Sequence, residues 1–346
     1  MGTTETIPVR EAHRFDEARL ASWLREKGLG TLTSVAQFPG GQSNPTFLLT
    51  TSDGERVLRK QPPGKLLPSA HAVDREFRVL SALGQAGMPV AKALAFCADR
   101  EVIGTPFFVM ERMRGRVFRR NDLPDVPKDE RRAIYEAMAQ AMAKLHAIDP
   151  VTIGLADYGK AGGYYARQVA TWTRQWEAQK PRENAALASL CAWLPANLAS
   201  DDDVRIAHGD FRVENLMFHE TEPRVVAIFD WELSTLGPPL ADLGYNVIPW
   251  LLPPIPKIGG FQGLDLAALG IPTREEHVAT YRAAATHAGE LQPFHVAFAM
   301  FRLAAILEGV LARARAGNAA AADAEAMGAL GTLFAERGWQ IAQKGL

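Results

Sequence analysis

The chain has 346 residues and a formal net charge of −1 at pH 7. This length allows a large core in two domains or in one two-lobed enzyme, while the near-neutral charge argues against nucleic acid or an anionic membrane as the main partner. Two cysteines exclude a disulfide framework, and without a signal-peptide core or a membrane-length apolar run we expect a cytoplasmic protein.

The first third of the chain has the pattern of an antiparallel sheet with one inserted helix. Residues 16–28 carry apolar side chains at helical spacing and end at Gly28, which favours a short helix before the sheet. A second helix, with Glu76 on it, is predicted over 70–86. The β-rich segments are separated by glycine-containing turns and cover 31–38, 46–51, 56–59, 92–99 and 106–113.

After residues 110–116 the pattern becomes mainly helical. The strongest helix is predicted over 127–148, where Pro127 suits the first turn and Pro150 stops the run. Thr273 and Glu276 form a capping box that predicts a helix to about residue 287. Further helices are expected within 164–198 (two of them), 241–252, 293–316 and 319–338. Residues 154–161 nearly match a P-loop, but Ala161 replaces the required hydroxyl residue, so we expect a loop there.

The segment 204–242 carries acids and an amide at suggestive spacing. Two strand-like runs, 216–218 and 225–229, flank a polar turn and predict a hairpin. Asn215 precedes the first run and Asp230 follows the second, so antiparallel pairing brings them together at the open end. Amide and carboxylate oxygens suit Mg²⁺, which completes its shell with phosphate and water.

The same segment offers the remaining parts of a phosphoryl-transfer centre. Asp210 lies a short loop before Asn215, where its carboxylate could orient an attacking hydroxyl, and Arg212 could offer a cation to the transferring group. The protein-kinase pattern H-R-D-x-x-x-x-N followed by D-F-G has the same offsets. Here it reads His208-Gly209-Asp210, then Asn215, then Asp230-Trp231-Glu232.

The upstream segments supply candidates for nucleotide binding. Gly41, Ser43 and Asn44 lie in a glycine turn whose backbone N–H groups could meet phosphates. Arg59 with Glu76 matches the device that aligns the α- and β-phosphates in kinases. Lys60 adjoins Arg59, and strand alternation turns only one of the two toward the nucleotide. The strand that would meet adenine carries the remaining candidates, Met110, Glu111 and Met113.

Each of these residues also has an ordinary structural interpretation. Isolated Asp and Asn residues in loops usually form turns or caps, and Arg59 with Glu76 could be a surface ion pair. We expect His208 to brace its loop, His146 to be a core histidine, and Asp242 to be structural. The agreement of offsets and hairpin geometry favours the catalytic interpretation.

Taken together, these segments resemble the aminoglycoside phosphotransferase/choline kinase-like family, a branch of the protein-kinase-like fold. The resemblance is carried by HGDFRVENLMF (208–218) and IFDWELSTLGPPLADLG (228–244), with FPGGQSNPTFLL, RVLRKQPPGK and DREFRVLSAL before them. GGQSNPTFLL, LPSAHAVDREFRVL and DWELSTLGPPLADL are most similar to the kinase-like domain fused to some acyl-CoA dehydrogenases and to its stand-alone bacterial relatives.

The resemblance implies a two-lobed α+β fold. A small antiparallel β-sheet lobe with one helix, residues 1–112, would bind the nucleotide, and a larger mainly α-helical lobe, residues 113–346, would hold the catalytic and substrate-binding residues. It implies Asp210 as catalytic base, Asn215 and Asp230 as Mg²⁺ ligands, and Asp242 as a brace of the catalytic loop. D-W-E in place of D-F-G argues against activation-loop switching.

The expected function is an ATP- and Mg²⁺-dependent small-molecule kinase that transfers the γ-phosphate to a substrate hydroxyl. The sub-group suggests a hydroxyacyl-CoA or a related metabolite as acceptor. The alternatives are an aminoglycoside phosphotransferase and a non-catalytic nucleotide-binding module. Aminoglycosides are polycations that favour an acidic cleft, whereas the substrate half carries the cations Arg167, Arg174, Lys180, Arg182, Arg274 and Arg282.

Overall fold

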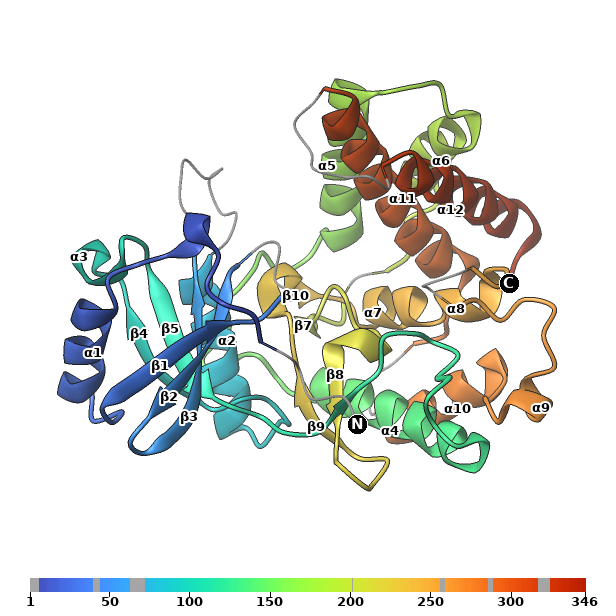
Figure 1. The fold of residues 1–346 in the computed structure, drawn as a ribbon. Helices are drawn as coiled ribbons and strands as arrows, with labels where there is room; N and C mark the ends of the chain where they lie inside the picture. Colours follow the sequence, from blue (N-terminus) through green and yellow to red (C-terminus); the bar gives the residue numbers. More distant parts are fainter. Residues whose placement is uncertain are drawn as a thin grey trace. The chain divides into compact units, whose positions relative to one another are not determined.

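The computed structural model describes residues 6–39, 44–62, 72–200, 202–255, 259–285, 289–316 and 324–346. The chain forms two compact units that interleave in sequence (Figure 1). The first unit comprises Met1–Phe118, Val151–Leu155 and Glu214–Leu233, and the second comprises Arg119–Pro150, Ala156–Val213 and Ser234–Leu346. The division into lobes at 112/113 stays a prediction beside these interleaved units.

The first unit is built on a five-stranded sheet in the order β1-β2-β3-β5-β4. Every neighbouring pair is antiparallel, and β2 and β3 are joined by the expected tight turn at Ser52 and Asp53. This confirms the predicted antiparallel sheet. The strands are β1 (Leu32–Gln37), β2 (Thr46–Thr51), β3 (Gly54–Lys60), β4 (Ala93–Cys97) and β5 (Phe107–Glu111).

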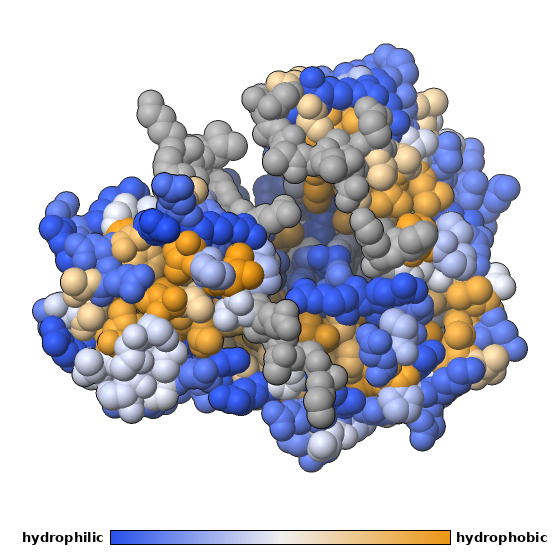
Figure 2. All heavy atoms as spheres, in the orientation of Figure 1, coloured by the Kyte–Doolittle hydropathy of each residue, from blue (hydrophilic) through white to orange (hydrophobic). Residues whose placement is uncertain are grey.

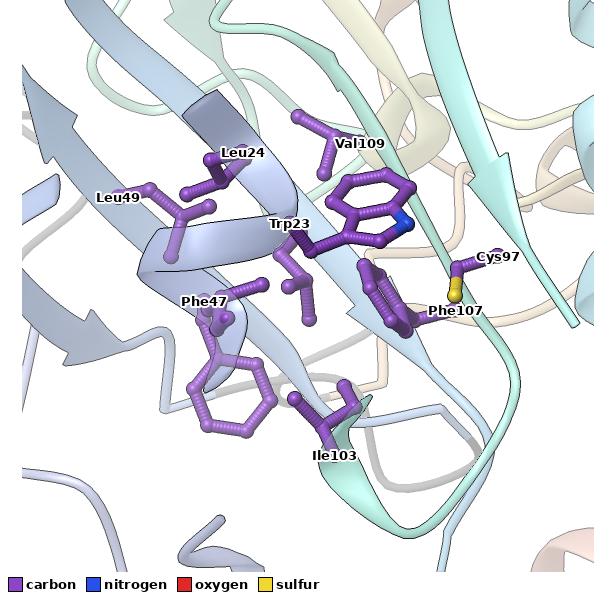
Figure 3. Packing of buried hydrophobic residues seen from close by; sticks show 10 residues of the cluster. Trp23, Leu24, Phe47, Leu49, Cys97, Ile103, Phe107 and Val109 are labelled. Atoms are coloured by element: carbon purple, nitrogen blue, oxygen red, sulfur yellow. The ribbon is translucent and has the colours of Figure 1, made fainter. Parts of the chain in front are cut away.

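Opposite faces of this sheet pack against different helices. Strand alternation sends Phe47, Leu58 and Phe107 into one core with Trp23 and other residues of α1 (Glu17–Glu26). Figure 3 shows Phe47, Phe107 and Trp23 within this core. The other face carries Phe108, whose ring centroid lies 6.0 Å from that of Phe77 on α2 (Val73–Gln85). Both helices were predicted, and Asp16 caps α1 by accepting from two backbone N–H groups.

The exposed side of α1 is charged, which agrees with an amphipathic surface helix. Figure 2 shows hydrophilic side chains at the left of the view, where α1 and the short helix α3 (Arg100–Ile103) lie. Glu17, Arg19, Arg25 and Glu26 are all exposed.

A second, three-stranded sheet of the first unit has the order β6-β8-β9. Its strands are β6 (Arg116–Val117), β8 (Leu216–Phe218) and β9 (Val225–Ile228). Leu216 pairs with Ile228 and Met217 with Ala227 in antiparallel register. The predicted hairpin is therefore confirmed, with Asn215 and Phe229 next to its last paired residues.

The second unit is helical, and α11 (Pro293–Arg315) lies at its centre, packed against α5, α7 and α12. Among the described residues, α11 alone is long and apolar enough to cross a membrane, but most of it is buried in the unit, as a core helix would be. A short antiparallel pair, β7 (Arg205–Ala207) with β10 (Thr235–Gly237), completes the unit. The other helices are α4 (Lys128–His146), α5 (Tyr164–Gln179), α6 (Ala185–Ala196), α7 (Pro239–Asn246), α8 (Ile248–Leu251), α9 (Leu266–Leu269), α10 (Arg274–Ala284) and α12 (Ala324–Lys344).

Local sequence signals account for most of these helices. The Thr273–Glu276 capping box is present in both directions, which confirms that prediction. The expectation of one helix over 241–252 was wrong: α7 ends at Asn246 and α8 begins at Ile248. Pro249 has no N–H to donate to the carbonyl of Tyr245, so a continuous helix cannot form. Residues 154–161 form a loop, as expected.

Candidate active site

Arg59, on β3, joins three carboxylates of the first unit. Its Nε lies 2.8 Å from Glu76 Oε2 on α2, and its Nη2 lies 3.1 Å from Asp230 Oδ1 and 3.6 Å from a carboxylate oxygen of Glu232. Arg59 is 13% exposed and Glu76 only 4%, so solvent screens their attraction weakly. One guanidinium facing three acids leaves an excess of negative charge that favours a further cation.

The structure resolves the choice between the two neighbouring cations of β3. Lys60 points to the opposite face, where its Nζ lies 5.2 Å from the centroid of the Phe15 ring. Phe15 in turn packs on Phe47 in the α1 core. Burial lowers the pKa of Lys60. The charge of Arg59 is instead balanced by nearby carboxylates. The strand cation paired with the helix acid is therefore Arg59.

Burial and charge act against each other within this cluster. For Glu76, burial is the larger influence and raises the pKa to about 7 against the attraction of Arg59. For Arg59, burial works to lower the pKa, but Glu76, Asp230 and Glu232 together outweigh it and raise the value. The guanidinium is charged at every relevant pH, and it keeps an otherwise unfavourable buried carboxylate in place.

The open end of the β8–β9 hairpin brings Asn215 beside the chain that leads to Asp230. The N–H of Phe229 donates to the carbonyl oxygen of Asn215 over 2.8 Å. Trp231 is 1% exposed and its Nε1–H donates to the carbonyl of Ile228, so the turn after β9 is anchored in the core. Asp230 itself has φ 62°, an uncommon conformation for a residue other than glycine. Residues held in uncommon backbone conformations cluster at active sites, so this conformation agrees with a functional role for Asp230.

Asn215 and Asp230 are suitable ligands for a hard divalent cation, because both present oxygen atoms. Among the described residues, no group of three or more His, Cys, Asp or Glu side chains could hold a metal ion by itself. A pair of oxygen ligands beside excess negative charge fits Mg²⁺, which in kinases takes its remaining ligands from phosphates and water.

The other predicted nucleotide-binding residues belong to the same unit. Asn44 is 1% exposed, and its carbonyl accepts from the Thr46 hydroxyl at the start of β2. Met110 and Glu111 end β5, and Met113 follows it half-buried. Gly41 and Ser43 lie outside the described residues.

Asp210 and Arg212 belong to the second unit, in the loop after β7. Asp210 Oδ1 accepts a hydrogen bond from the Tyr245 hydroxyl of α7, and Arg212 Nε lies 3.2 Å from the same oxygen. Asp210 is 17% exposed, so its carboxylate is sheltered but accessible to solvent. Burial, and then the charge of Asp210, raise the pKa of Tyr245, which keeps its hydroxyl protonated as a donor.

Asp242, also on α7, holds the backbone of this loop. Its carboxylate accepts from the N–H of His208 over 2.6 Å and from the N–H of Gly209 over 2.8 Å. Burial works to raise the pKa of Asp242, but the bonds from His146 and Gly209 and the nearby histidines lower it overall. Gly209 has φ 86°, a conformation that glycine adopts without strain. His146, expected in the core, is buried there and lies 3.2 Å from Asp242 through Nε2.

Sequence reasoning missed three residues that support the loop. Arg302 Nη2 donates to the carbonyl of Gly209, and Asn246 Nδ2 donates to the carbonyl of Phe211 over 2.9 Å. The third is Tyr245. A signal for two of them was available, because Asp242, Tyr245 and Asn246 share one face of a helix at spacings of three and four. Arg302 is a lone cation within a long apolar run of α11.

Comparison with known proteins places the chain in a family. Residues 34–256 match the model of the phosphotransferase enzyme family. The curated protein acyl-CoA dehydrogenase family member 10 of Mus musculus is 41% identical over 355 residues, which cover 99% of this chain and 33% of that protein. The chain thus spans about a third of the length of that relative.

Solved structures show the same fold. A Ralstonia eutropha JMP134 protein, provisionally named an aminoglycoside phosphotransferase, is 42% identical and superposes with a TM-score of 0.87 over 96% of this chain and 99% of its own. A thermostable mutant of aminoglycoside phosphotransferase APH(4)-Ia, bound to ADP and hygromycin B, is 16% identical with a TM-score of 0.60, over 94% of this chain and 98% of its own. These likenesses confirm the predicted α+β, kinase-like fold class.

Proposed function

We propose that this chain is an ATP- and Mg²⁺-dependent small-molecule kinase. The chain belongs to the phosphotransferase enzyme family and is a phosphotransferase with an alcohol group as acceptor. The observation that carries the proposal is the Arg59 cluster. A strand cation is held by a buried helix acid at 2.8 Å and also meets the acid of the D-W-E segment at 3.1 Å. A kinase uses such a cation to bind the phosphates of ATP, and it uses an acid in the position of Asp230 to bind the metal ion.

Each residue has a defined role in the proposed reaction. Asp210 accepts a hydrogen bond from the substrate hydroxyl and orients it toward the γ-phosphorus. The hydroxyl oxygen forms a bond to the γ-phosphorus and gives its proton to Asp210, the bond between the γ-phosphorus and the β,γ-bridging oxygen breaks, and ADP leaves. Arg59 binds the α- and β-phosphates, and Arg212 offsets charge on the transferring group. Mg²⁺ held by Asn215 and Asp230 would neutralise charge on the phosphates.

The nucleotide assignment rests on the first unit. Gly41, Ser43 and Asn44 are proposed to contact phosphates, and Met110, Glu111 and Met113 to line the adenine position. Support comes from the ion pair between Arg59 on β3 and Glu76 on α2, in the same unit. Further support is the ADP bound in the APH(4)-Ia complex, which shares the fold.

For the acceptor, we propose a hydroxyacyl-CoA or a related hydroxylated metabolite. The support is the mouse relative, whose name refers to acyl-CoA chemistry and which this chain matches at 41% identity. The cations of the helical unit add less support than expected, since several are already engaged: Arg182 with Glu308, Lys180 with Glu183, and Arg274 with Glu275. The name of the Ralstonia protein makes an aminoglycoside the competing acceptor.

The test is transfer of labelled γ-phosphate from ATP to a panel of hydroxyacyl-CoAs, hydroxy acids, aminoglycosides, sugars and choline. The proposal predicts Mg²⁺-dependent labelling of a hydroxylated acyl compound, abolished by EDTA. Labelling of aminoglycosides alone would replace the acyl acceptor by an antibiotic. Absence of ATP binding in calorimetry with Mg²⁺ would contradict kinase function itself and favour a non-catalytic role.

A further inference from the structure

The hydroxyl of Tyr245 is directed at the carboxylate of Asp210 within the second unit. It donates to Oδ1, the oxygen that also lies 3.2 Å from Arg212 Nε. Tyr245 is 9% exposed, so little water competes for this bond. Because burial and Asp210 both raise the pKa of Tyr245, the phenol remains a donor throughout the neutral range.

Tyr245 is itself held by the elements that hold the loop backbone. The Arg302 guanidinium, from α11, lies 5.5 Å from the centroid of the Tyr245 ring, and Arg302 also donates to the carbonyl of Gly209. One turn before Tyr245 on α7, Asp242 accepts from the N–H groups of His208 and Gly209. The same helix therefore fixes the backbone of the loop and one oxygen of its carboxylate.

We propose that Tyr245 is a positioning residue for Asp210, an inference that rests on the proposed kinase function. Its hydroxyl fixes the rotamer of the carboxylate. A carboxylate held in one orientation before the substrate arrives needs little reorganisation in the transition state. The bond from Tyr245 supplies that orientation from a rigid helix rather than from the loop itself.

The test is the substitution Tyr245→Phe, which removes the hydroxyl and keeps the ring beside Arg302. The acceptor is unidentified, so the probe is slow ATP turnover with water as acceptor in Mg²⁺ buffer. We expect kcat to fall about 10- to 100-fold, as for loss of a hydrogen bond to a charged group. KM for ATP stays within twofold, since Tyr245 makes no proposed contact with the nucleotide.

The split between kcat and KM, measured beside the melting temperature, separates positioning from a general structural role. Loss of the orienting bond lowers kcat, while KM for ATP stays near its wild-type value and the melting temperature stays near that of a control that loses another buried tyrosine hydroxyl. A purely structural defect would lower the melting temperature further, together with kcat.

Tyr135→Phe is the matched control. Tyr135 is a buried tyrosine of the same unit, and its hydroxyl donates to the carbonyl of Asn121 over 2.6 Å, away from the 208–212 loop. Unchanged kcat in this variant, with a lowered kcat and an unchanged KM for ATP in Tyr245→Phe, supports the inference. If Tyr245→Phe matches the wild type, or if both variants lose activity equally, the inference is overturned while kinase function stands. A wild type that neither turns over ATP nor binds ATP with Mg²⁺ in calorimetry would overturn both.

Discussion

Replacing Arg59 by Met removes the cation at the centre of the first unit and keeps much of its apolar stem. Glu76 would then lie 4% exposed on α2 without its partner at 2.8 Å. Removing one member of a buried ion pair costs about 3–5 kcal/mol, because the other charge stays buried. Asp230 is 37% exposed, so solvent screens its attraction to Arg59, and loss of that attraction costs at most about 1 kcal/mol.

This destabilisation depends on pH in a defined direction. Burial already raises the pKa of Glu76 to about 7 from an ordinary 4.5, and loss of Arg59 raises it further. The folded state of the variant therefore binds this proton more tightly than the unfolded chain does. Its stability rises as pH falls from about 7 toward 4.5, by up to about 1.4 kcal/mol per pH unit. The wild type shares this slope between about 7 and 4.5, because its own Glu76 has a pKa of about 7. The deficit against the wild type therefore changes only above pH 7, where the variant carboxyl still binds its proton, and it is larger at pH 8 than at pH 7.

Hydrogen exchange of the β3 and α2 amides measures the opening free energy of the first unit itself. The matched control is Lys60→Met, which removes the neighbouring cation from the opposite face of the strand. We expect that variant to stay within about 1 kcal/mol of the wild type, since its cation–π contact with Phe15 is weak and burial disfavours its charge. The double variant Arg59→Met/Glu76→Leu should regain most of the loss, because no charge is left unpaired.

Equal stability of Arg59→Met and Lys60→Met at pH 8 would refute the reasoning. So would a double variant as unstable as Arg59→Met alone, because the loss would then come from packing rather than from the buried carboxylate.

The remaining predictions concern the second unit. Asp242→Asn replaces a carboxylate that accepts the N–H groups of His208 and Gly209. We expect stability to fall by about 2–3 kcal/mol, measured by melting curves, and ATP turnover to fall at least tenfold. Burial lowers the pKa of His277 to about 3, below the ordinary 6.5, so the wild type loses stability as pH falls from 6.5 toward 3, by up to about 1.4 kcal/mol per unit from this residue. His277→Gln should flatten that slope in acid titrations of unfolding.

Features set by local pattern could be predicted from the sequence. The strands of the first sheet follow period-2 alternation and tight turns, and α4 follows helical periodicity with proline at both ends. The β8–β9 hairpin placed Asn215 and Asp230 correctly at its open end because antiparallel register is a local property.

Features that depend on packing between distant segments could not be predicted. Alternation shows that Arg59 and Lys60 face opposite ways, but only the position of α2 decides which one meets an acid. The bond from Arg302 to Gly209 joins residues 93 positions apart, and that from Tyr245 to Asp210 joins residues 35 apart. The break before α8 was within reach of the sequence, since Pro249 alone forbids a continuous helix.

The most direct test of the central claim is single-turnover transfer of labelled γ-phosphate by the wild type and by Asp210→Asn, with Mg²⁺-ATP affinity measured for both by calorimetry. The account predicts ATP affinity within about threefold and phosphate transfer lowered by at least about 100-fold, because an asparagine amide cannot accept the proton of the attacking hydroxyl while no proposed nucleotide contact is lost. An Asp210→Asn variant that binds ATP and transfers phosphate as fast as the wild type would contradict the account.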